Sequence, residues 1–139
     1  MRKGTQELLN RLKETDDIQK HLDENDSEII KETLQGYLNG MLQIKGMKAG
    51  DVATLSGQGE YVYKVFQGKR KASRDILIAV SVGMALTVAE TQLLLRIAQT
   101  AQLDPRNRKD SVIIYALNNA LSIDKVNEIL YDIGEATLN

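Results

Sequence analysis

The 139-residue sequence contains no cysteine and a single histidine, and both shortages remove classes of function. Without cysteine the chain cannot form a disulfide, a thiolate zinc site or a cysteine nucleophile. The lone histidine, His21, stands in a polar, acidic neighbourhood that is typical of a surface residue. No spacing in the chain brings together a convergent pair of carboxylates for acid–base chemistry. We therefore expect no enzymatic activity, no metal site and no cofactor.

Long hydrophobic runs are also missing. No stretch approaches the roughly 20 apolar residues that span a bilayer, so we expect no membrane helix. The first residues lack the continuous apolar stretch of a signal peptide. Together with the absence of cysteine, this favours a cytoplasmic location. The length suits one domain with a single sizeable core.

The net charge of −1 argues against a generally basic nucleic-acid-binding protein, but the charges are unevenly distributed. Residues 60–75 form a basic segment within an otherwise acidic chain. Such a segment indicates a localised anion-binding surface, and its alternative is a solvated loop. The basic residues of this segment are Lys64, Lys69, Arg70, Lys71 and Arg74.

A second, smaller basic group follows Pro105 and consists of Arg106, Arg108 and Lys109. It is interpreted either as a second phosphate contact or as a solvated loop between helices.

Apolar residues recur at helical spacings along almost the whole chain, which predicts an all-α fold of eight or nine short helices. The first 26 residues are acidic and predict an N-terminal helical arm. Five stretches show helix signals. These are a helix from Ser27 to Ile44 capped by Ser27, one capped by Ser73, one opened by a Thr87–Glu90 capping box, one from about Lys109 to Leu121, and one from Ser122 to Gly134.

Residues 49–68 follow the spacing of a helix-turn-helix. The small Ala53 lets two helices cross closely, and Gly57 suits the positive φ that the turn needs. Val62 and Val65, three apart, would seat the second helix on the core. This helix, about residues 60–67, would then turn Tyr61, Tyr63 and Lys64 outward.

The same region resembles the Cro/repressor-type (XRE) helix-turn-helix family, and more narrowly a Firmicutes-type subgroup of it. The resemblance extends upstream to Ser27 and downstream to Leu138, and so covers most of the chain. Two departures occur: Ala72 stands where the family usually has proline, and one residue fewer separates Ser56 from Gly68. The matching residues are Ser56, Gly57, Tyr61, Tyr63, Val65, Phe66, Gly68, Lys69, Arg70, Ser73, Arg74 and Asp75.

The resemblance implies a lambda-repressor-like, five-helix DNA-binding core over residues 27–101. It also implies that residues 102–139 form a C-terminal helical extension, which we expect to pack on the same core, and that residues 60–67 are the recognition helix. We accordingly expect a transcriptional regulator that binds double-stranded DNA. Few cations per subunit favour a homodimer, and the apolar C-terminal helices would form its interface or simply close the core.

Two sets of contacts follow from this hypothesis. Base edges would be read by Gln58, Glu60, Tyr61 and Lys64. Phosphates would be held by Tyr63 and by the basic loop 69–74, through Lys69, Arg70, Lys71, Ser73 and Arg74. For Arg74 an ion pair with Asp51 or Asp75 is the competing interpretation.

The alternative function is a protein-interaction or antitoxin-like adaptor on a helix-turn-helix scaffold, with weak or no DNA binding. The acidic flanks, the near-zero net charge and the shortened turn favour a protein partner of this kind.

Overall fold

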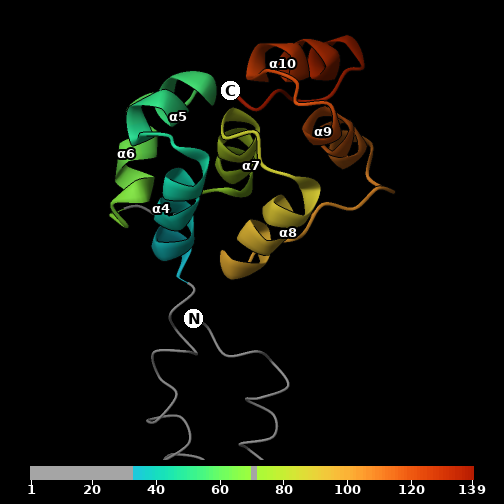
Figure 1. The fold of residues 1–139 in the computed structure, drawn as a ribbon. Helices are drawn as coiled ribbons and strands as arrows, with labels where there is room; N and C mark the ends of the chain where they lie inside the picture. The colour runs from blue at the N-terminus through green and yellow to red at the C-terminus, as the bar shows by residue number, and fades with distance from the viewer. Residues whose placement is uncertain (1–32, 70–71) are drawn as a thin grey trace, which may run out of the picture.

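The structure, a computed structural model, describes residues 33–69 and 72–139. These residues form seven α-helices and no strand, so the fold class is all-α, as the sequence predicts (Figure 1). The predicted N-terminal arm lies outside the described residues. The helices are α4 (Leu34–Lys45), α5 (Ala49–Leu55), α6 (Tyr61–Phe66), α7 (Arg74–Gly83), α8 (Val88–Ile97), α9 (Arg108–Asn118) and α10 (Ile123–Asp132).

Helix α4 begins later than the sequence predicts. Thr33, and not Ser27, is the N-cap: its backbone is extended, and its hydroxyl accepts a hydrogen bond from the Gly36 N–H at 3.0 Å. The predicted cap, Ser27, lies outside the described residues. The prediction was wrong about the helix start because Thr33 offers an equally good cap inside the same apolar pattern.

The other predicted helix starts are confirmed. Ser73 caps α7 and Ser122 caps α10, each by accepting a hydrogen bond from a backbone N–H three residues later. Thr87 and Glu90 form the predicted capping box, with bonds of 3.1 and 2.8 Å. At the other end of α10, Gly134 adopts the left-handed conformation (φ 80°) that terminates the helix.

Helix α7 lies at the centre of the molecule (Figure 1). All seven of its residues from Leu77 to Gly83 are buried, and it contacts α5, α8, α9 and α10. One hydrophobic core collects residues from every described helix. A helix that is apolar on all sides needs such complete coverage, so the C-terminal helices cover a face of α7 that would otherwise be exposed.

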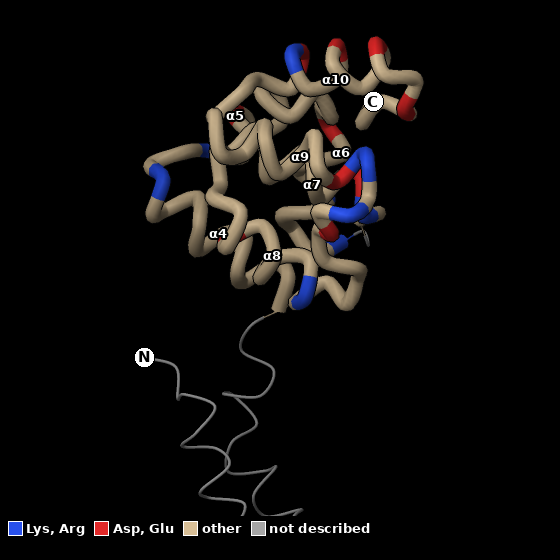
Figure 2. The backbone as a smooth tube through the Cα atoms, turned by 90° about the vertical axis from the view of Figure 1, so that its right-hand side faces the viewer, with Lys and Arg blue, Asp and Glu red and all other residues tan. Residues whose placement is uncertain are grey.

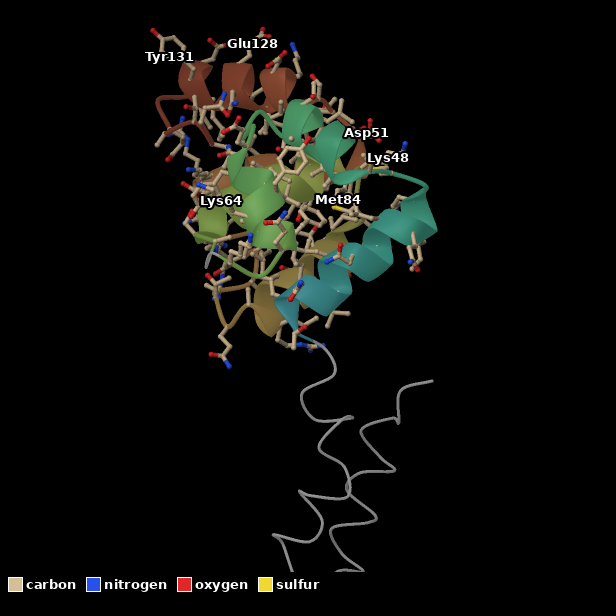
Figure 3. The ribbon with its side chains drawn as sticks, turned by 90° about the vertical axis from the view of Figure 1, so that its left-hand side faces the viewer. Lys48, Asp51, Lys64, Met84, Glu128 and Tyr131 are labelled. Atoms are coloured by element: carbon tan, nitrogen blue, oxygen red, sulfur yellow. The ribbon has the colours of Figure 1, made fainter. Side chains whose placement is uncertain are left out.

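The apolar side chains of α9 and α10 point into this core. Ile113, Val126 and Leu130 are fully buried. The residues considered for a dimer surface therefore close the core of their own chain. The outer side of the pair carries two exposed aromatic residues, Tyr115 and Tyr131, the second of which is labelled in Figure 3.

Over the described residues, no helix has the length and apolar character that would let it cross a bilayer.

Candidate nucleic-acid interface

Helices α5 and α6 and the short turn between them occupy the residues for which the sequence predicts a helix-turn-helix, and they are called the α5–α6 unit below. Two glycines of the turn, Gly57 (φ 73°) and Gly59 (φ 60°), adopt left-handed backbone conformations that other residues enter with strain. The Gly59 N–H donates to the carbonyl of Ala53 at 3.1 Å, which closes the turn on α5. The turn is thus closed by a backbone hydrogen bond and depends on two glycines.

The inner side of α6 packs against the hydrophobic core. Val62 and Val65 are buried, as the sequence predicts, and Phe66 is buried beside them. Close packing beneath the unit also fixes α5 on α7. A Cβ atom on Gly83 would lie 2.8 Å from the backbone nitrogen of Ser56, so only glycine permits this approach.

The outer side of α6 is exposed and carries Glu60, Tyr63, Lys64 and Gln67, at the spacings that place residues on one helical face. Within the described part of the chain, their side chains make no hydrogen bond or ion pair with another residue. Figure 3 shows Lys64 projecting from this side of the molecule. Four polar groups are therefore presented to solvent on a rigidly seated helix.

Sequence reasoning missed Gln67 and placed Tyr61 too far outward. Tyr61 is half-buried against the core, because it lies four residues before the inward-facing Val65 and shares its side of the helix. Gln67 follows Lys64 by three and Glu60 by seven, so the helical period alone was a sufficient signal for it.

Tyr63, predicted to contact phosphate, lies across the first turn of α5. Its hydroxyl is 3.0 Å from the position that a Cβ atom on Gly50 would take. Gly50 therefore makes room for the phenol, and Tyr63 as a whole remains 43% exposed. The hydroxyl lies where the two helices of the unit meet.

Gln58, predicted to contact bases, is half-buried in the turn and bonded to a distant segment. Its Nε2 donates a hydrogen bond of 3.0 Å to the carbonyl oxygen of Leu138. Its backbone N–H donates to the buried Ser56 hydroxyl. Unlike the residues on the outer face of α6, Gln58 is held in place by the rest of the protein.

The basic loop is described only in part, because Arg70 and Lys71 lie outside the described residues. Lys69 is exposed. The Ser73 hydroxyl accepts the capping bond from Ile76, which leaves its own O–H as a donor for a phosphate oxygen.

Arg74, predicted to contact phosphate, is engaged by other residues of the chain. Its guanidinium donates to both carboxylate oxygens of Asp110, at 2.8 and 3.1 Å. It also donates to the carbonyls of Ala101 and Gln102. The competing interpretation, an internal ion pair, is the observed one, but the partner is the buried Asp110 and neither Asp51 nor Asp75. No local pattern could identify an acid 36 positions away.

The second basic group lies beside the start of α7. Lys109 pairs with Asp75 at 3.3 Å, and Arg108 donates to the carbonyl of Ile133 at 2.8 Å. Arg106 is highly exposed and bonds to Asp104, which lowers the pKa of that carboxyl. Figure 2 shows basic and acidic segments side by side at the edge of the molecule beside α7, further basic segments at the opposite edge near α4, and mostly acidic residues on α10.

Comparison with known proteins identifies no relative: no family model, no curated protein and no solved structure matches the chain. Across the described residues, no cluster of histidine, aspartate or glutamate has the arrangement of a metal site.

Proposed function

We propose that the chain is a sequence-specific DNA-binding protein, a transcriptional regulator that places α6 in the major groove of double-stranded DNA. The observation that carries this proposal is the division of α6 into two sides. Its inner side is buried, and its outer side presents Glu60, Tyr63, Lys64 and Gln67 without intramolecular partners in the described structure. Five helices, α4 to α8, lie within the residues expected to form a lambda-repressor-like core.

The chemistry of this face suits the reading of base edges. A lysine donates to the O6 and N7 acceptors of guanine, a glutamine bonds to adenine in a bidentate manner, and a glutamate accepts from the cytosine amino group. We assign Lys64, Gln67 and Glu60 to these contacts, and Gln58 to a fourth at the start of the helix. Tyr61 is the weakest of the predicted base contacts, because its ring packs against the core.

Phosphate contacts would come from the residues that flank α6. We retain Tyr63, Lys69, Arg70, Lys71 and Ser73 for this role and omit Arg74, whose guanidinium is engaged by Asp110. So few cations per subunit give weak binding to one half-site. A homodimer that reads two half-sites about 34 Å apart would provide the missing affinity.

The test is selection of duplexes from a randomised pool, followed by titration of the selected duplex at several salt concentrations. We expect a selected sequence and an affinity that falls steeply with salt. Lys64→Glu/Lys69→Glu should abolish binding. A matched control, Arg96→Glu/Lys125→Glu, makes the same change in net charge at two exposed positions outside the proposed contact set and should bind nearly as well as the wild type.

Two results would contradict the proposal: a pool that yields no sequence, or equal losses in the two double variants. Equal losses would show that only net charge matters, as expected for non-specific attraction to a polyanion.

A second candidate function is a protein-interaction adaptor, favoured by one feature of the surface. Leu55 and Ile44 are 51% and 74% exposed, and Leu55 lines a surface groove of about 440 Å³ together with Met47, Asp51 and Thr54. A purified partner that binds the wild type but not a Leu55→Glu variant, in a protein that selects no DNA, would establish this function instead.

A further inference from the structure

The C-terminal segment, residues 135–139, returns from the end of α10 to the turn of the α5–α6 unit (Figure 1). Leu138 is its anchor, with a side chain that is only 4% exposed. The Leu138 N–H donates to Oδ1 of Asn127 on α10 at 2.8 Å. Its carbonyl accepts from Nε2 of Gln58 at 3.0 Å. One residue therefore joins the C-terminal helices to the start of the recognition helix.

The turn is shaped to receive this segment. A Cβ atom on Gly57 would lie 3.1 Å from Oδ1 of Asn139 and 3.8 Å from Cγ2 of Ile123 on α10. The space beside the glycine is thus filled by the segment and by α10. The turn that lacks one residue relative to the family pattern is supported by residues about 80 positions later in the chain.

The hydrogen bond that Gln58 donates to Leu138 orients its carboxamide and leaves other donor and acceptor groups of that carboxamide available. A carboxamide has two N–H donors and an acceptor oxygen with two lone pairs. Leu138 takes one N–H, which leaves the second N–H and Oε1. These are the two groups that a bidentate contact to adenine requires. A side chain held in this way loses less rotational freedom on binding than the exposed Gln67 would.

We propose that Leu138 is a positioning residue for DNA reading, and that it orients the Gln58 carboxamide toward one base pair of each half-site. Asn127 supports it by accepting the Leu138 N–H. The inference rests on the proposed function, and it makes the C-terminal extension part of the specificity apparatus.

The experiment compares base preference at each position of the selected duplex for the wild type, Gln58→Ala, Leu138→Ala and Asn127→Ala. Gln58→Ala should remove preference at one base pair per half-site, by about tenfold, within the range of a bidentate contact. Leu138→Ala and Asn127→Ala should remove preference at that same base pair and leave the salt dependence unchanged. The double variant Gln58→Ala/Leu138→Ala should lose nothing further there. Leu138→Met, which keeps the apolar anchor and both backbone bonds, should retain the preference.

Three results would overturn the inference. Unchanged base preference in Leu138→Ala would show that residues 135–139 only pack against the turn. A uniform loss of preference at every base pair would show a general structural effect. Tighter binding by Leu138→Ala would show that the segment blocks Gln58 instead of orienting it.

A measurement on the free protein separates failure of the inference from failure of the proposed function. The side-chain amide signals of Gln58 in a ¹H–¹⁵N spectrum should show slowed hydrogen exchange, and Asn127→Ala should speed it. If the wild type selects no DNA while this protection is present, the proposed function fails and the contact is structural. If the wild type selects DNA while Gln58 is unprotected, only the inference fails.

Discussion

The outer face of α6 and the junction between α7 and α9 both carry basic residues that the sequence assigns to DNA, yet the structure employs them differently. Lys64 is exposed and makes no bond to another described residue. Arg74, ten residues later, makes four hydrogen bonds within the chain and faces the buried Asp110. The difference lies in the partner: whether a cation can reach a ligand depends on acids and carbonyls brought near it by the fold.

The largest expected effect tests the junction. Arg74→Met should lower the free energy of unfolding by about 3–5 kcal/mol, because it leaves the Asp110 carboxylate buried without its counter-ion. Denaturation by urea, followed by circular dichroism, measures the loss. Arg74→Met/Asp110→Leu should recover much of it, since an apolar pair avoids the desolvation of two charges. A loss below 1 kcal/mol in the single variant would show that the pair is solvated and that Arg74 can serve a ligand after all.

A smaller effect tests the close approach of α7 to the end of α5, the helix that precedes α6. Gly83→Ala should cost about 1–3 kcal/mol, because the added methyl group meets backbone atoms of Leu55 and Ser56 that cannot move aside without shifting α5. The matched control is Gly40→Ala in α4, where a Cβ atom has no neighbour within 4 Å. That change should stabilise the protein by about 0.5–1 kcal/mol, as alanine does within a helix. Equal effects of the two substitutions in thermal unfolding would contradict the close approach of α5 and α7.

Local sequence patterns were sufficient to predict most helix starts and the buried side of α6. The caps at Ser73, Thr87 and Ser122 depend on residues three positions apart, and the inward pair Val62 and Val65 depends on one helical turn. These relations can be seen within a few residues of sequence.

The candidate site was predicted less completely, because its decisive contacts join distant segments. Arg74 bonds to Asp110, 36 positions later in the chain, and Gln58 bonds to Leu138, 80 positions later. A composition of basic residues shows where charge accumulates in the sequence, but only the tertiary arrangement shows which charges remain for a ligand. Gln67 is the exception, since the period of α6 already placed it on the outer face.

Substitutions on the outer face of α6 should affect DNA binding and leave stability almost unchanged, unlike those at the junction between α7 and α9. Lys64→Ala and Gln67→Ala should each change the free energy of unfolding by less than about 0.5 kcal/mol, as surface substitutions without partners do. Under the proposed function each should still weaken binding to the selected duplex by about tenfold. Chemical denaturation and duplex titration on the same samples measure both quantities. A large stability loss in either variant would show that the face is part of the scaffold.

A pH-dependent effect is expected at Glu90, whose half-buried carboxylate pairs with Lys45 and so joins α8 to α4. Burial raises the pKa of Glu90, but the hydrogen bond from the Thr87 N–H and the ion pair with Lys45 at 3.3 Å outweigh it, so that the pKa lies below the ordinary 4.5. A carboxyl with a lowered pKa in the folded state stabilises the protein above the pKa of the unfolded chain and loses that contribution as the pH falls through the folded value.

Glu90→Gln should therefore reduce the free energy of unfolding by about 0.5–1 kcal/mol at neutral pH, because the amide still accepts the Thr87 N–H but loses the charge that strengthens this bond and the partly exposed ion pair with Lys45. The difference from the wild type should shrink as the pH falls below about 4.5. Urea titrations between pH 3 and pH 7 measure it, with Glu128→Gln, in the exposed pair with Lys125, as a control that changes stability little at any pH. A constant difference across this range would mean that the carboxylate charge contributes nothing and that only the neutral capping bonds hold the start of α8 beside α4.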